Sequence, residues 1–173
     1  MLEYLSCLVH EIERTKILIV TREDHEKLCG DALRAGIPRE KVVLARAPFS
    51  EMPKYLRLID LGVFFIKSCF SKRASCATKL GEFLASGVPV VINSGVGDSD
   101  RIVRENDVGV VIPMTVRQDF AESMCNVRRL LNDPQTAARC RATARRYFDV
   151  NEGAKKYASL YRYLIGSADG DGS

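Results

Sequence analysis

One stretch decides the fold of this chain, Thr78-Lys-Leu-Gly-Glu-Phe-Leu-Ala-Ser-Gly-Val-Pro-Val-Val91. Its first nine residues predict a short helix that carries one acidic residue, Glu82, and Gly87 ends that helix. The apolar run 88–92 that follows is typical of a buried strand. A loop, an acid-bearing helix and a strand in this order suit a ligand that lies across helix N-termini at the edge of a parallel sheet.

Strands and helices alternate along the rest of the chain. Short apolar runs predict strands at 16–20, 42–45, 61–66, 89–92 and 109–112. Helical spacing of apolar residues predicts helices at 2–14, 24–35, 50–59, 78–86, 99–105, 117–132, 135–147 and 152–165. Gly36 and Ser50 are expected to cap the second helix at its end and the third at its start. Strict alternation predicts an α/β fold, a Rossmann-like doubly wound parallel sheet with helices on both faces.

Length and charge limit the class of protein. The 173 residues suffice for one α/β domain, which we expect at 1–165, followed by a disordered tail at 166–173. No apolar run approaches the roughly 20 residues that span a bilayer, and the start lacks the pattern of a signal peptide, so we expect a cytoplasmic protein. A net charge of +4 is too small to indicate nucleic-acid binding.

The side chains that most often bind metals are few or scattered. Six cysteines form no Cys-x-x-Cys pair, and only His10 and His25 could join them in a metal site. We therefore expect free thiols and neither a metal nor another cofactor. Many basic residues lie between Arg128 and Lys156, either on a solvated helix face or on a surface that meets anionic lipid or another domain.

The ligand site of an open parallel sheet lies beyond the C-terminal ends of its strands. The loops 21–24, 45–50 and 67–78 should meet there. The last loop carries cations and hydroxyls ahead of a helix N-terminus, where they can hold a diphosphate or form an ordinary solvated loop: Lys67, Lys72, Arg73, Ser75, Thr78 and Lys79. Glu82 can accept hydrogen bonds from the vicinal hydroxyls of a ribose if it faces the crevice, with Gly81 giving the ligand close approach. Otherwise it lies on the outer face.

A second glycine-rich turn, Gly95-Val-Gly97, lacks the third glycine of a dinucleotide fingerprint and follows a late strand. It therefore disfavours an NAD-dependent oxidoreductase.

Four segments carry a family resemblance: Lys54-Tyr-Leu-Arg-Leu-Ile-Asp60, Ser75-Cys-Ala-Thr-Lys-Leu-Gly-Glu82, Gly95-Val-Gly97 and Asp107-Val-Gly109. Together they resemble the C-terminal, donor-binding half of a GT-B glycosyltransferase of the retaining group 1 type (family GT4), with similarity from Lys16 to Leu164. The resemblance implies binding of a nucleotide diphosphate sugar, UDP- or GDP-linked, and transfer of a hexosyl group to an acceptor with retention of configuration. The acceptor could be lipid-linked, which would place the protein at a membrane surface.

Individual site residues follow from the resemblance. Glu82 matches the second glutamate of the family's Glu-x7-Glu motif, which holds the ribose, whereas the first glutamate is replaced by Ala74. The diphosphate would then face the backbone of the loop together with polar side chains, at Ser75, Ala77, Thr78 and Lys79. Ala47 and Pro48 match the segment whose main chain contacts the base.

The family's donor domain opens with a strand and a glycine-rich loop, whereas this chain begins in the helix that follows them. We therefore expect a fragment that lacks the N-terminal acceptor domain and is inactive alone. The gap in the sheet would be closed by direct pairing of the flanking strands or by a second copy of the chain, which would make a homo-oligomer. Two other functions stay open, a GT-B-related nucleotide-sugar epimerase and a non-catalytic interaction module.

Overall fold

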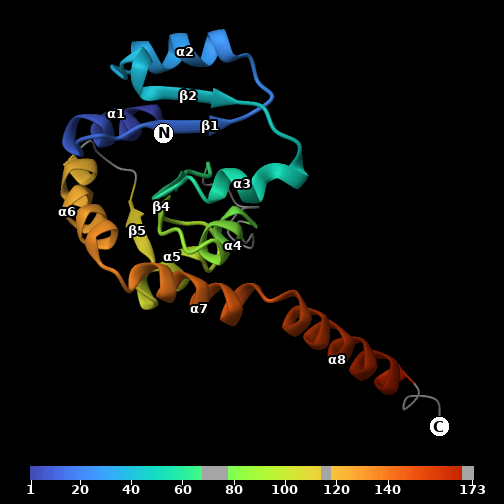
Figure 1. The fold of residues 1–173 in the computed structure, drawn as a ribbon. Coiled ribbons are helices and arrows are strands. Elements are labelled where there is room, and N and C mark those ends of the chain that lie inside the picture. Colours follow the sequence, from blue (N-terminus) through green and yellow to red (C-terminus); the bar gives the residue numbers. More distant parts are fainter. Residues whose placement is uncertain (68–77, 114–117, 169–173) are drawn as a thin grey trace.

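The computed structural model describes residues 1–67, 78–113 and 118–168 (Figure 1). Its elements alternate as the sequence predicts. The helices are α1 (Leu2–Glu11), α2 (His25–Arg34), α3 (Met52–Leu56), α4 (Thr78–Ala85), α5 (Ser99–Glu105), α6 (Gln118–Asn132), α7 (Thr136–Phe148) and α8 (Val150–Ala168), with short 3-10 turns η1 (Arg39–Lys41) and η2 (Phe49–Glu51). The strands are β1 (Ile17–Val20), β2 (Val42–Ala45), β3 (Gly62–Phe64), β4 (Val90–Asn93) and β5 (Gly109–Ile112).

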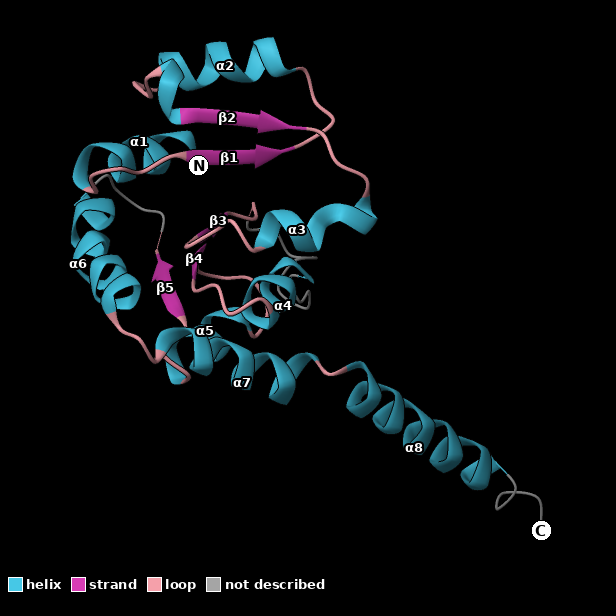
Figure 2. Cartoon of the chain, in the orientation of Figure 1, coloured by secondary structure: helices cyan, strands magenta, loops and turns pink. Residues whose placement is uncertain are grey.

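All strand pairs are parallel, and the strands form two sheets (Figure 2). In one, β1 pairs with β2, with Ile17 opposite Val42. In the other, β4 lies between β3 and β5, with Val90 opposite both Gly62 and Gly109. Among the described residues no strand pairing joins β1 to β3. The expected direct pairing of the flanking strands is therefore wrong, because side chains rather than backbone hydrogen bonds connect the two sheets.

Two apolar cores cover opposite faces of β4. Val91 packs into a core with residues of α1, α6 and both sheets, including Tyr4, Ile17, Val42, Ile112 and Met124. Val90 and Ile92 pack into a second core beneath α4, α5 and α7, which includes Leu80, Leu84, Val103 and Cys140. Successive residues of a strand point to opposite faces, so a strand covered on both sides reads as an unbroken apolar run. This confirms the Rossmann-like layering.

Tyr4 fastens α1 to the rest of the first core. Its ring is fully buried and makes edge-to-face contacts with Phe65 and Phe120, at centroid distances of 5.5 and 5.2 Å. Its hydroxyl lies 3.0 Å from the Ser123 hydroxyl on α6. Burial raises the pKa of Tyr4 to about 12. The phenol therefore stays neutral and hydrogen-bonded across the physiological range.

Most element bounds agree with the prediction within a few residues, and two differ in an informative way. Gly36 and Gly87 end their helices with φ of 82° and 83°, as expected. Ser50 caps no helix, because it lies inside η2, which begins directly after Pro48. The short α3 follows, with Pro53 in its first turn, where proline is tolerated. Helix α8 continues to Ala168, past the predicted end at 165, and the tail 169–173 lies outside the described residues.

Cys7, Cys29, Cys125 and Cys140 are free thiols, as expected, while Cys69 and Cys76 lie outside the described residues. The described residues contain no cluster of side chains suited to a metal ion. No helix in this part of the chain is long and apolar enough to cross a membrane.

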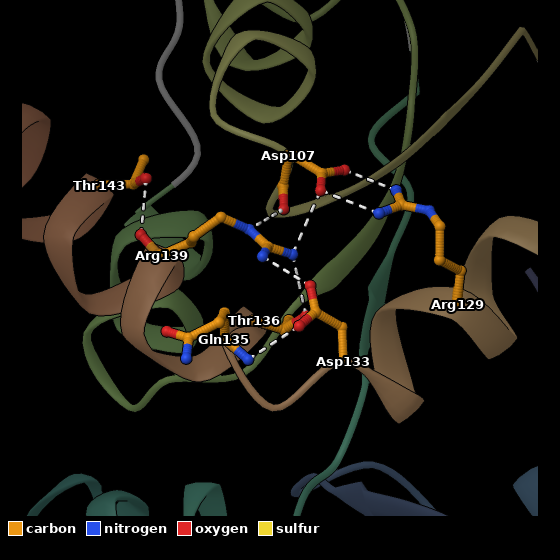
Figure 3. A network of polar contacts seen from close by, with 7 residues as sticks. All are labelled: Asp107, Arg129, Asp133, Gln135, Thr136, Arg139 and Thr143. Carbon is orange, nitrogen blue, oxygen red and sulfur yellow. Dashed lines mark hydrogen bonds and ion pairs between the residues drawn. The ribbon is translucent and has the colours of Figure 1, made fainter.

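A polar network connects the turn before β5 to α6 and α7 (Figure 3). Asp107, with a positive φ of 49°, accepts two hydrogen bonds from Arg129, at 2.9 and 2.6 Å. Arg139 donates to the Asp107 carbonyl at 3.1 Å and pairs with Asp133 at 2.6 Å. The Arg129 hydrogen bonds hold the pKa of Asp107 below its usual value.

We expect Asp107→Asn to lower the free energy of unfolding by at most about 1 kcal/mol at neutral pH, because the carboxylate is half exposed. Asparagine tolerates the positive φ, so the change removes charge and leaves the turn. The folded-state pKa of Asp107 is depressed, so its contribution is present above the unfolded pKa of about 3.9 and is lost as pH falls through the folded pKa. Urea unfolding at neutral and acidic pH checks this. A difference between the two proteins that did not shrink in acid would contradict it.

Candidate functional site

An open groove of about 590 Å³ runs along the seam between α4 and α7. One face of α4 lines it at helical spacing, with Thr78, Gly81, Glu82 and Ala85. The opposite wall comes from α7 and the residue after it, with Arg141, Ala144, Arg145, Phe148 and Asp149. The two helices are antiparallel, because Phe148 contacts the start of α4 at Gly81 while Arg141 contacts its end at Gly87.

Close packing of α7 against α4 explains why residue 81 is a glycine. A Cβ atom at this position would lie 3.0 Å from Cγ of Phe148, so the ring occupies the space beside the glycine. The backbone of Gly81 still lines the groove, so close approach of a ligand to it stays a prediction. Its role is to let α7 approach α4, and this contact forms the floor of the groove.

The charged groups along the groove are largely free to meet a ligand. Glu82 is exposed, and its carboxylate forms no hydrogen bond or ion pair with any described residue. Arg141 and Arg145 are likewise unpaired within the described part of the chain. Asp149 accepts from the backbone N–H of Asn151 at 2.8 Å and so caps α8. The groove can thus accept hydrogen bonds from hydroxyls at Glu82 and donate to an anionic group from the arginines.

Asn93 organises the neighbouring edge of the sheet, and the sequence prediction missed it. Its buried side chain accepts from the Ile66 N–H at 2.7 Å and donates to the Ile66 and Ser94 carbonyls at 2.9 and 3.1 Å. These bonds fix the backbone after β3 immediately before Lys67, and they explain why β3 ends at Phe64 instead of reaching Ile66. The one available sequence signal is a polar residue at the end of an apolar run.

The structure brings together only some of the predicted site residues. Thr78 and Glu82 share the groove, one turn apart on α4. Lys79 is exposed on the first turn of α4 and Lys67 is exposed after β3, and neither lines the groove. Ala47 and Pro48 follow β2 in the other sheet and do not line it either. Ser75 and Ala77 lie outside the described residues.

Comparison with known proteins agrees with this architecture. The family model described as "Glycosyl transferases group 1" matches residues 1–133. Among solved structures, the chain is similar to a sucrose-phosphate synthase from Thermosynechococcus elongatus, with 18% identity and a TM-score of 0.72 over 96% of this chain and 42% of that one. It is also similar to WaaG, a glycosyltransferase involved in lipopolysaccharide biosynthesis, with 20% identity and a TM-score of 0.61 over 84% of this chain and 37% of that one.

A variant of the O-GlcNAc transferase from Thermobaculum terrenum is a further structural match, with 18% identity and a TM-score of 0.63 over 94% of this chain and 32% of that one. At these identities the likeness concerns the fold. The chain spans less than half the length of each of these three proteins. No curated protein matches the sequence.

Proposed function

Because this chain belongs to the glycosyl transferases of group 1, we propose that it forms the donor-binding part of a retaining hexosyltransferase of the GT4 type and binds a UDP- or GDP-linked sugar. The observation that carries this proposal is the position of Glu82, an unpaired carboxylate on an open groove with the Thr78 hydroxyl one helical turn away. A free carboxylate at this place suits the paired hydroxyls of a ribose better than a structural role, because no described residue uses it.

Each residue then has a specific task. Glu82 accepts hydrogen bonds from the ribose hydroxyls and orients the nucleotide. The diphosphate lies at the N-terminus of α4, where free backbone N–H groups and the helix dipole favour negative charge. Thr78 donates its hydroxyl there, and Lys79, on the same turn, adds a positive charge. The same groups stabilise the charge that develops on the leaving diphosphate as the sugar is transferred.

The acceptor belongs to a part of the enzyme outside this chain. The solved relatives are more than twice as long as the matched region, and we propose that a further domain of a longer, cytoplasmic polypeptide supplies the acceptor site. This chain alone would bind the donor without transferring the sugar.

Glu82→Gln is expected to weaken binding of UDP or GDP by about tenfold, because a charged acceptor of two hydrogen bonds becomes a neutral one. Isothermal titration calorimetry on both proteins measures the change. Glu122→Gln on α6 is the matched control, since it removes the same charge from an exposed helical site that does not line the groove, and its affinity should equal that of the wild type. Equal affinities for both variants would remove Glu82 from the site.

One observation favours a second function, a non-catalytic interaction module. The family's first glutamate is replaced by Ala74, so the carboxylate expected at the donor sugar is missing. A thermal-shift screen with UDP, GDP and ADP separates the two functions, because a module without a nucleotide site gains no stability from any of them. An epimerase is disfavoured, since His10 lies on α1 and His25 on α2, and neither lines the groove.

A further inference from the structure

The side chain of Asn93 takes the place of a neighbouring strand just beyond the end of β3. The backbone pairing of β3 with β4 ends at Phe64 and Ile92, whereas β4 stays paired with β5 as far as Asn93, opposite Ile112. Two residues beyond β3, the Ile66 N–H donates to Oδ1 of Asn93 and the Ile66 carbonyl accepts from its Nδ2. One side-chain amide therefore does what two peptide groups of a neighbouring strand do in a parallel sheet.

This arrangement separates the ends of β3 and β4 while their backbone groups keep partners. Asn93 is only 6% exposed, and a backbone N–H or carbonyl beside it would be costly to leave unpaired. The same amide donates to the Ser94 carbonyl at 3.1 Å, so it holds the chain where it leaves both strands. Ligands of open parallel sheets bind beyond the carboxyl ends of the strands. Asn93 therefore fixes the ligand edge of the sheet between β3 and β4.

Lys67 is the residue that this arrangement places. It directly follows Ile66, and its side chain is exposed. Ile66 packs against the core that contains Leu80 of α4, and Phe65 packs against the core on the other face of the sheet. With the hydrogen bonds from Asn93, the backbone before Lys67 is held from three sides. Lys67 forms no ion pair with any described residue, so its charge is available to a ligand.

Lys67 and the start of α4 lie at the same edge of the sheet. Helix α4 connects β3 to β4, and these strands are parallel, so the N-terminus of the helix lies at their carboxyl ends. The proposed function places a diphosphate at this N-terminus, next to Thr78 and Lys79. Lysine carries its charge on a flexible stem of four carbons, which suits an anion that lies beyond the end of the strand.

We propose that Asn93 is a positioning residue of the donor site, a role that rests on the nucleotide-sugar function proposed above. Asn93 holds the backbone of Ile66, so that Lys67 extends to the diphosphate of the donor as a second cation beside Lys79. Asn93 itself does not touch the ligand. A fixed backbone before Lys67 reduces the conformational entropy that is lost when the lysine side chain becomes ordered on the diphosphate.

Lys67→Ala tests the contact with the diphosphate. Isothermal titration calorimetry compares UDP with uridine and GDP with guanosine, since each pair differs only in the diphosphate. The variant should bind the nucleoside diphosphate about fivefold more weakly than the wild type and the nucleoside equally well. Lys16→Ala is the matched control, because Lys16 is exposed next to the amino end of β1, at the opposite edge of the sheet, and its affinities should equal those of the wild type.

Asn93→Ala tests the positioning role, at a temperature at which circular dichroism shows each variant to be folded. It should also lose about fivefold in affinity for the nucleoside diphosphate and nothing for the nucleoside. Asn93→Ser leaves a polar group in the same space, and as the milder variant it should behave in the same way. Gly109→Ala is the control for stability alone. It introduces a clash with the Val90 carbonyl at the amino end of β4, and its affinity should be unchanged.

A double variant shows whether the two residues act together. Asn93→Ala combined with Lys67→Ala should bind no more weakly than either single variant, because both changes remove the same interaction. Additive losses, an equal loss for the nucleoside, or an equal loss in Gly109→Ala would overturn the positioning role. If Glu82→Gln weakens binding but Lys67→Ala does not, the inference is wrong and the proposed function stands. A wild type that binds neither UDP nor GDP would refute both.

Discussion

Gly109→Ala is expected to lower the free energy of unfolding by about 3 kcal/mol. Gly109 opens β5 directly opposite Val90 of the central strand. A Cβ atom there would overlap the carbonyl oxygen of Val90 and lie 2.8 Å from its Cγ2 and 3.0 Å from Cγ1 of Val103 on α5. The backbone oxygen cannot rotate away as a side chain could, so β5 must move out of register or lose the pairing. Urea unfolding followed by circular dichroism measures the change.

Gly153→Ala serves as the control for this prediction. A Cβ atom at Gly153 meets no atom within 4 Å, so the substitution introduces no clash. Alanine favours a helix over glycine by about 1 kcal/mol, and the helical signal of α8 should therefore persist to a higher temperature. If Gly109→Ala were as stable as Gly153→Ala, the close approach of β5 to β4 described above would be wrong.

Asn93→Ala should have the second largest effect, a loss of about 2–3 kcal/mol in the free energy of unfolding. The substitution removes three hydrogen bonds at once and leaves both the N–H and the carbonyl of Ile66 without their partner. Part-buried backbone groups without partners cost about 1–3 kcal/mol each, and water that enters the vacated space offsets some of that cost. Thermal unfolding followed by circular dichroism gives the stability.

A second asparagine provides the comparison. Asn106 donates a single hydrogen bond, to the Ile102 carbonyl at 2.8 Å, at the exposed end of α5. Asn106→Ala should therefore cost no more than about 1 kcal/mol. If the two alanine variants lost equal stability, the two hydrogen bonds between Asn93 and Ile66 would contribute no more to the free energy of unfolding than the single bond of Asn106.

Local signals in the sequence were sufficient for most of the fold. Unbroken apolar runs located β4 and β5, and glycines at the ends of α2 and α4 located their C-termini, because these signals depend on neighbouring residues. The contacts that shape the site depend instead on residues far apart in the chain. Phe148 fills the space beside Gly81, and Asn93 holds Ile66, and neither pairing leaves a pattern that a single sequence reveals.

The candidate site was predictable to a similar degree. Glu82 was predicted as the acidic residue on a helix that leads into a buried strand, and Thr78 as a hydroxyl at the N-terminus of that helix. Arg141 and Arg145 were interpreted as part of a basic surface that is either solvated or meets anionic lipid or another domain, since nothing in the sequence indicates that α7 packs antiparallel to α4. Ala47 and Pro48 follow a strand of the other sheet, and their predicted contact with a base is untested by the geometry of the groove.

The separation of β1 from β3 has a mechanical consequence. Since no backbone ladder bridges this seam within the described residues, small sliding of one half against the other would strain side-chain packing alone. In such sliding, the loop after β2 would move with the β1–β2 sheet and α4 with the β3–β4–β5 sheet. A nucleotide that contacted both the loop after β2 and α4 would restrict this sliding, and binding would make the two halves of the molecule more rigid relative to each other.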